Sequence, residues 1–350
     1  DYAAAQNNLG LAYLVGLHLG IGNRVTTIER AISCYQEALR FHTLETAPLE
    51  YATSQRNLGH VYLYLARFTD ESDPSSHLRQ AIAYFQEALR FRTSKTAPLE
   101  YSATLDDLGD AYLALPTGDR AGNIERAIGY YQEALRFRTP ETSPAEYAFT
   151  QRGLGEAYLA LATGDRSADV DRATICYLEA LRFLTPDTSP LQCLLTAFDL
   201  GNIHFTQGTW QAALNAYRVA VAAGEIFYRS GLSSVSKEYE VALSEALYRN
   251  AAFAAARCGK ITDALLLLEQ GKTRLLTEAL RLRIRRPTHV PDEVWEAFER
   301  AGAAVRALLL NSEDAIRASA RRIEPIVWET DAEAQVNVAR TFTSRVEGIQ

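Results

Sequence analysis

The residues of this sequence that are able to do nucleophilic chemistry are four cysteines and six histidines. Cysteine-protease catalysis needs a histidine that activates the thiolate, with both side chains at strand ends in an α/β domain. No stretch of the sequence is rich in strand-forming residues, so we predict buried small thiols, surface imidazoles and no catalytic residue. The residues concerned are Cys34, Cys176, Cys193, Cys258, His18, His42, His60, His77, His204 and His289.

Patterns for binding metal or nucleotide are also missing. The cysteines form no CxxC pair, which argues against a zinc site or a disulfide framework and fits a reducing cytosol. Asp70, Glu71 and Asp73 lack the glycine and terminal glutamate of a calcium loop, so we expect a solvated acidic segment. Gly271-Lys272-Thr273 matches the last three residues of the phosphate-binding loop pattern, but the glycine that this pattern requires five residues earlier is missing. We predict no metal and no cofactor.

Charge and composition restrict the class of protein. The 350 residues carry 43 acidic and 36 basic side chains, for a net charge of -7, which argues against a nucleic-acid-binding protein. No run approaches the roughly 18 apolar residues that a membrane span needs, and no signal-peptide pattern is present. We expect a cytoplasmic protein. The chain starts at Asp1 and has no methionine, which we interpret as a piece of something longer.

The densest positive patch is a run of four arginines within six residues. Such a patch suits a phosphate or an acidic partner. We favour the plainer interpretation of a cationic helix C-terminus that ends before Pro287 and is stabilised by the helix dipole. The four residues are Arg281, Arg283, Arg285 and Arg286.

The helices that position these residues are indicated by one sequence pattern, which recurs five times. Each unit has a Leu-Gly pair, with tyrosine three residues after the glycine in the first four units and His204 in the fifth. The glycines are Gly10, Gly59, Gly109, Gly155 and Gly201, at spacings of 49, 50, 46 and 46. Further on come an alanine, an aromatic residue and an alanine at steps of four and three, which is one face of a helix. These triplets are Ala31/Tyr35/Ala38, Ala81/Phe85/Ala88, Ala127/Tyr131/Ala134, Ala173/Tyr177/Ala180 and Ala213/Tyr217/Ala220.

The pattern predicts two helices per unit, because small residues let helices approach and aromatic rings fill the space beside them. One pair cannot bury its apolar face alone, so pairs must stack. We predict an all-α fold, a right-handed superhelical solenoid of helix-turn-helix repeats with a C-terminal helical extension. We also expect each Leu-Gly-x-x-Tyr tyrosine to be hidden between helices.

The expected domains follow from where the pattern stops. Five repeats span residues 1–222, a degenerate sixth with Ala264, Leu268 and Gly271 at its second-helix positions spans 223–271, and a helical cap or linker spans 272–350. In the cap, the residues from Val294 to Leu308 step by four and three along one amphipathic helix face.

Two further patterns concern the connections within the array. Ser143 and Ser189, each followed by proline, predict capping boxes at helix starts. The distance from the glycine to the alanine is 21, 22, 18 and 18 residues in the first four units but 12 in the fifth. We therefore expect an insertion between the two helices of each of the first four units.

Leu-Gly-x-x-Tyr on a first helix and Ala-x-x-x-Phe on a second resembles the tetratricopeptide repeat (TPR) family. The resemblance implies a concave groove that binds a protein or peptide, at positions two before and two after the leucine and a turn earlier. On this sequence those positions give the candidate residues Asn7, Arg56, His60, Asp106, Asp110, Phe149, Arg152, Glu156, Leu195, Phe198 and Asn202, with Leu11 as a further one.

Charge at the groove positions alternates along the array. We expect Asp106 and Asp110, flanked by Arg56 and Arg152 of adjacent units, to form a stripe that selects a ligand by electrostatic complementarity. The alternative is that these residues are simply solvated.

The segment from Leu268 to Leu282, LEQGKTRLLTEALRL, together with the elongated repeats, resembles the part that precedes the peptidase domain in bacterial TPR-CHAT proteins. The resemblance implies a non-catalytic scaffold or sensor, the regulatory region of a CHAT-family cysteine protease whose protease domain is absent from this chain. The alternatives are a stand-alone peptide adaptor and the sensor array of a nucleotide-dependent signalling protein. Enzyme activity within these residues ranks last.

Overall fold

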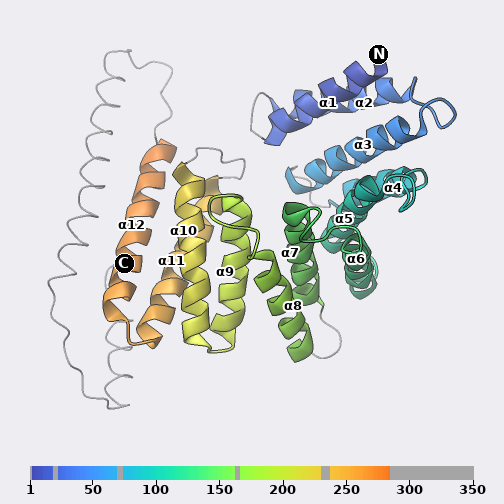
Figure 1. The fold of residues 1–350 in the computed structure, drawn as a ribbon. Helices are drawn as coiled ribbons and strands as arrows, with labels where there is room; N and C mark the ends of the chain where they lie inside the picture. Colours follow the sequence, from blue (N-terminus) through green and yellow to red (C-terminus); the bar gives the residue numbers. More distant parts are fainter. Residues whose placement is uncertain (1, 19–22, 69–73, 162–165, 230–236, 284–350) are drawn as a thin grey trace, which may run out of the picture. The chain divides into compact units, whose positions relative to one another are not determined.

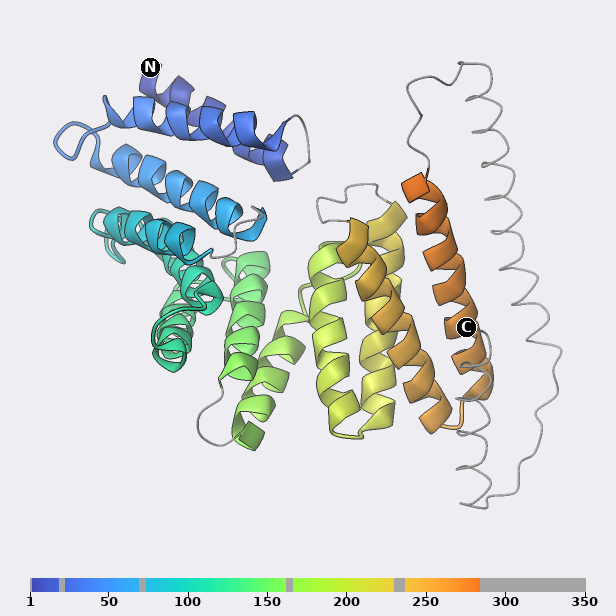
Figure 2. The ribbon, with the colours of Figure 1, turned by 180° about the vertical axis from the view of Figure 1, so that it is seen from behind.

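The computed structural model describes residues 2–18, 23–68, 74–161, 166–229 and 237–283, and these residues form twelve α-helices and no strand. Consecutive helices pair, and the pairs stack in chain order (Figures 1 and 2). The helices are α1 (Tyr2–His18), α2 (Arg24–Leu39), α3 (Pro48–Phe68), α4 (Ser75–Leu89), α5 (Pro98–Ala114), α6 (Arg120–Ala134), α7 (Pro144–Ala160), α8 (Arg166–Ala180), α9 (Pro190–Thr206), α10 (Trp210–Arg229), α11 (Lys237–Arg257) and α12 (Ile261–Arg283). The predicted all-α repeat fold is confirmed.

Several predictions fall on residues outside the described part of the chain. These are the acidic segment from Asp70 to Asp73, the arginines beyond Arg283, and the amphipathic helix from Val294 to Leu308. Of the predicted C-terminal extension, only residues 272–283 are described, as the end of α12.

Close contact between a glycine and an aromatic ring holds each of the first five pairs together. A Cβ atom added to Gly109 of α5 would lie 2.6 Å from Cε1 of Tyr131 on α6, closer than real Cβ atoms come to carbon. The same clash would arise at the other four repeat glycines. The rings that occupy this space are fully buried, and so are the alanines on either side of them: the rings are Tyr35, Phe85, Tyr131, Tyr177 and Tyr217. Only glycine lets the first helix approach the ring this closely.

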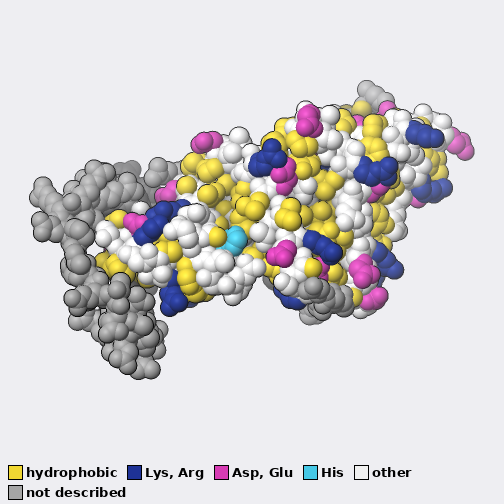
Figure 3. Space-filling model, turned by 60° about the horizontal axis from the view of Figure 1, so that its bottom comes forward, with side chains coloured by type: hydrophobic (Ala, Val, Ile, Leu, Met, Phe, Trp, Pro, Cys, Tyr) yellow, Lys and Arg dark blue, Asp and Glu magenta, His cyan; other side chains and the backbone are white. Residues whose placement is uncertain are grey.

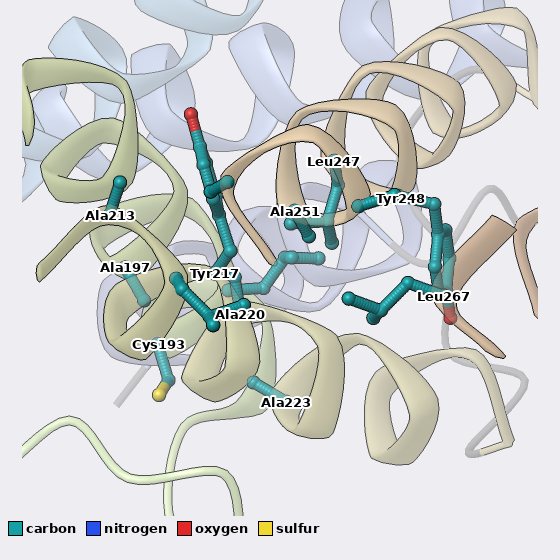
Figure 4. Close-up of a cluster of buried hydrophobic side chains, with 14 of the residues drawn as sticks. Cys193, Ala197, Ala213, Tyr217, Ala220, Ala223, Leu247, Tyr248, Ala251 and Leu267 are labelled. Atoms are coloured by element: carbon teal, nitrogen blue, oxygen red, sulfur yellow. The ribbon is translucent and has the colours of Figure 1, made fainter. Parts of the chain in front are cut away.

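The sixth pair also brings a glycine against a tyrosine, on the opposite helices, but there the closest atom is the tyrosine Cβ and not the ring. Tyr248 of the first helix, α11, packs on Gly271 of the second helix, α12, where an added Cβ would lie 2.7 Å from the Tyr248 Cβ. Figure 4 shows Tyr248 beside Leu267, in the same apolar cluster as Tyr217. The α12 helix continues through Gly271 to Arg283 without a break. The domain limits expected at 222 and 271 stay predictions.

The tyrosines of the Leu-Gly-x-x-Tyr pattern are less buried than expected. Tyr112 is 9% exposed, whereas Tyr13, Tyr62 and Tyr158 are half-buried. Their rings lie at the edge of the helix pair, where Tyr112 stacks on Tyr130 with 5.6 Å between ring centroids. The second-helix ring already fills the space between the helices, which explains this difference.

The extra residues of the early units lie mostly in helices. The α6 helix begins at Arg120, seven residues before Ala127, whereas α10 begins at Trp210, only three residues before Ala213. The added helical turn accounts for most of the longer glycine-to-alanine distance. The connection itself stays short, with Gly118 at φ +84° and the Asp119 side chain accepting a hydrogen bond from the Gly122 amide at 3.0 Å.

The predicted capping boxes at Ser143 and Ser189 are wrong, since neither side chain caps its helix. Two threonines, three residues apart, order the connection instead. Thr43 and Thr46 each donate a backbone N–H to the other's hydroxyl at 3.2 Å, and their hydroxyl oxygens are 2.9 Å apart. The pairs Thr93/Thr96, Thr139/Thr142 and Thr185/Thr188 repeat this arrangement. Proline then starts the next helix, as expected.

Two glycine substitutions in one helix pair test the packing. Gly109→Ala should lower the free energy of unfolding by about 1–3 kcal/mol, because the new methyl group meets the Tyr131 ring. Gly129→Ala on α6 is the matched control, with no atom within 4 Å of the added Cβ, and should raise it by about 0.5–1 kcal/mol through helix propensity. Urea denaturation measures both. Equal effects would show that the glycine–ring contact does not set the helix spacing.

Candidate binding groove

First helices of successive pairs lie side by side in the array. Contacts join α1 to α3, α3 to α5, α5 to α7, and α9 to α11. The predicted groove residues lie on α1, α3, α5, α7 and α9, so they follow this row of first helices. In the space-filling view of one face, arginine and acidic side chains lie beside each other among apolar ones rather than in blocks of one charge (Figure 3).

Asn7 and Asn202 use their side-chain oxygens within the array. Asn7 Oδ1 accepts hydrogen bonds from Ser54 and Asn57 of α3, both at 3.2 Å. Asn202 Oδ1 accepts from the Tyr217 hydroxyl at 2.8 Å and from Asn250 of α11 at 3.4 Å. Both amides therefore connect neighbouring helix pairs.

Arg56 and His60 of α3 share one buried acid, Asp107 of α5. Arg56 Nε donates to Asp107 Oδ2 at 2.5 Å, and His60 Nε2 lies 3.4 Å from the same oxygen. Burial alone would raise the pKa of Asp107, but His60 and Arg56 outweigh it and hold this pKa below its usual value. Asp107 is not among the predicted groove residues, because the repeat pattern places Asp106 and Asp110 as the acids beside Arg56.

Asp106 and Asp110 are bound within the chain. Asp106 pairs with Arg138 at 3.2 Å, and Asp110 accepts from the Tyr131 hydroxyl at 2.7 Å, with Arg67 at 3.8 Å. Burial raises the pKa of Asp106, and Arg138 opposes this rise. Arg152, expected beside these acids, pairs with Glu156 on its own helix. The predicted stripe is thus a set of internal ion pairs.

Arg138 lies in the connection before α7 and was missed by the sequence analysis. It is buried and donates to the Thr150 hydroxyl at 2.7 Å, so it joins two units as well as neutralising Asp106. Arg92 has the equivalent position one unit earlier and donates to Thr53 at 2.7 Å. The Phe-x-Thr pattern recurs at these connections and is the sequence signal that could have indicated them.

The apolar end of the predicted groove is made by three residues of α7 and α9. Phe149 is 38% exposed. Leu195 and Phe198 are half-buried, and the Phe198 ring lies 6.0 Å from that of Tyr217. On α1, the further candidate Leu11 is 46% exposed.

Asp199 of α9 is an acid that the groove prediction did not include. It is half-buried, and it has no ion pair or hydrogen bond with any residue that the structure describes. Burial and the negative charge of Glu156 together raise the pKa of Asp199 to about 7, against the opposing effect of Arg152. Burial also raises the pKa of Glu156, against the opposing effect of Arg152.

The described residues contain no group of three or more His, Cys, Asp or Glu side chains placed to hold a metal ion. Burial raises the pKa of Cys176 and of Cys193 to about 11, which keeps both thiols protonated near neutral pH. No helix in the described ranges combines the length and apolar character that crossing a membrane requires.

Stacked helix pairs with these contacts define a TPR-like repeat array. BtubC (BKLC) from P. vanneervenii is a solved structure similar to this chain, with a TM-score of 0.50, 18% identity, and 76% of this chain and 96% of that chain covered. The apo form of RapI has a TM-score of 0.47 and 17% identity, with 91% and 97% covered. No protein-family model matches the sequence. No curated protein matches it significantly. At these identities the BtubC likeness concerns the fold alone.

Removing the Asp107 charge tests the buried ion pair. Asp107→Asn should lower the free energy of unfolding by about 3 kcal/mol, at the low end for a broken buried pair because Arg56 keeps some solvent access. The deficit should shrink as pH falls below about 4, since a depressed pKa stabilises only above the unfolded value. Glu133→Gln, in an exposed pair with Arg136, is the control and should cost under about 1 kcal/mol. Equal losses in urea denaturation would contradict this assignment.

Asp199 should show the opposite pH dependence. A raised pKa means that folding binds a proton, so stability falls as pH rises from about 4 to about 7. Asp199→Asn should remove this fall and stabilise the protein above pH 7, by at most about 4 kcal/mol for a shift of about three pKa units. Urea denaturation from pH 4 to pH 8 measures the effect. Asp171→Asn at an exposed position of α8 is the control and should change stability by under about 0.5 kcal/mol.

Proposed function

We propose that this chain is a non-catalytic scaffold or sensor that binds a protein or peptide along its row of first helices. The proposal rests on one observation, which is that polar and charged side chains of α1, α3, α5, α7 and α9 occupy one row in a TPR-like array. Hydrogen bonds and ion pairs hold most of them in place before any ligand arrives. Such preorganisation lowers the entropic cost of binding.

We further propose that the array regulates a CHAT-family cysteine protease. The support is the resemblance of the elongated repeats and of the segment from Leu268 to Leu282, which lies on α12. In this role the array holds the protease domain in a controlled state and releases it when a partner binds. A stand-alone peptide adaptor and the sensor array of a nucleotide-dependent signalling protein are the alternatives.

Sequencing the natural reading frame on both sides of this segment separates these proposals. We expect the frame after Gln350 to encode an α/β domain with a histidine and a cysteine at strand ends. A frame that stops there, or that continues without such a pair, would exclude the protease. A phosphate-binding loop encoded before Asp1 would favour the signalling protein.

Peptide binding is tested by selecting random dodecapeptides on the full chain and measuring their affinity by fluorescence anisotropy. Phe149→Asp adds a charge to the predicted groove at an exposed position and should weaken the selected peptides at least tenfold. Ile175→Asp adds the same charge at a 66% exposed position on the second helix α8 and should leave affinity unchanged. If Ile175→Asp is the damaging change, the ligand binds to the second helices.

A further inference from the structure

The row of first helices is least continuous between α7 and α9. Other neighbouring first helices contact each other more extensively, and the contact between α8 and α9 is the smallest of those that join one pair to the next. In Figures 1 and 2, α8 diverges from α9 toward its N-terminal end. Side chains of α7 and α9 at this junction are thus less enclosed by neighbouring helices.

Charge is uncompensated at the same junction. On α5, Asp107 lies beside Arg56, Asp106 beside Arg138, and Asp110 3.8 Å from Arg67. At the junction Arg152 is the base that acts on Asp199, but Arg152 forms its ion pair with Glu156. When Asp199 is ionised it therefore adds a negative charge without a paired base, in surroundings that disfavour the charged form.

A buried hydroxyl without a partner in the described residues lies near these charges. In the third and fifth pairs, the second-helix tyrosine donates to the residue after the repeat glycine, Tyr131 to Asp110 and Tyr217 to Asn202. In the fourth pair the equivalent hydroxyl of Tyr177 is fully buried and has no partner in the described residues. Its charged neighbours include Asp199, Glu156 and Arg152.

We propose that Glu156, Asp199 and the Tyr177 hydroxyl form a binding site for a cationic side chain, arginine or lysine, of a peptide partner. The proposal rests on the proposed peptide-binding function and names the chemistry of the ligand. A cation beside Asp199 supplies the counterion that this carboxylate lacks. A planar guanidinium has several N–H donors, so it is able to donate to Asp199 and to Glu156 at the same time. Glu156 that turns from Arg152 toward the cation also comes within reach of Tyr177, in the place that Asp110 has beside Tyr131.

The same charges discriminate against an anionic ligand. An acidic side chain at the junction would meet two carboxylates, and Arg152 is already engaged by Glu156. The acids on α5 offer no equivalent site, because Arg138, Arg67 and Tyr131 already bind them.

The test is a double-mutant cycle on the peptides selected against the full chain. We expect these peptides to contain an arginine or lysine whose replacement by norleucine weakens binding at least tenfold to the parent chain. On Asp199→Asn the same replacement should change affinity less than twofold, because the cation has lost its partner. Asp187→Asn, in the connection before α9, is the matched control and should keep the tenfold effect.

Two further measurements keep folding separate from binding. Asp199→Asn should bind the basic peptides more weakly while unfolding at a higher urea concentration at pH 8, a combination that mere structural damage does not produce. Tyr177→Phe keeps the buried ring and should weaken these peptides about threefold if Glu156 turns toward the hydroxyl.

The possible failures are distinct. Selected peptides that depend on Phe149 but show the same norleucine effect on parent and Asp199→Asn would overturn the cation site and leave the proposed function standing. Peptides enriched in acidic residues would also overturn it. Failure to select any peptide would overturn peptide binding by the groove, and the cation site with it.

Discussion

The whole array depends on how closely a glycine backbone approaches an aromatic ring. At Gly109 the buried Tyr131 ring occupies the space that a single added methyl group would fill. This contact sets the spacing of the two helices, and the alanines one turn away on either side bury themselves as a result. The sixth pair also places a glycine against a tyrosine, Gly271 on the second helix and Tyr248 on the first, although the closest atom there is the Tyr248 Cβ.

The fold was predictable because the pattern of glycine, aromatic residue and alanines that this close packing requires recurs five times in the sequence. Features that occur only once could not be predicted in this way. Asp107 is an example, because it lies one residue away from a position that the repeat pattern assigns to the groove. Its importance comes from burial beside Arg56, and a single sequence carries no record of burial. The Ser143 capping box failed for another reason. Its local pattern was correct, but the threonine pair already ordered the connection, and the serine hydroxyl stayed without a partner.

Electrostatics divide the row of first helices into two kinds of position. Ion pairs such as Arg138 with Asp106 join units and leave little charge for a ligand. Asp199 is the opposite kind, because its charge opposes folding near neutral pH and is satisfied by nothing in the described part of the chain. Residues that reduce stability without an internal partner are typical of functional sites, where selection for binding overrides selection for stability. The groove positions taken from the repeat pattern do not separate these two kinds of residue.

The threonine pairs in the connections bear on how such an array evolves. The two threonines of each pair bond to each other, and Thr46 also donates to the backbone carbonyl of Phe41, so the pair borrows no side chain from the helices that it joins. A crossover between genes at one of these points would preserve the bonds of the threonine pair. Units could then be duplicated, lost or exchanged between arrays without repair of that pair, which gives the lineage a way to change the number of stacked helix pairs in single genetic steps.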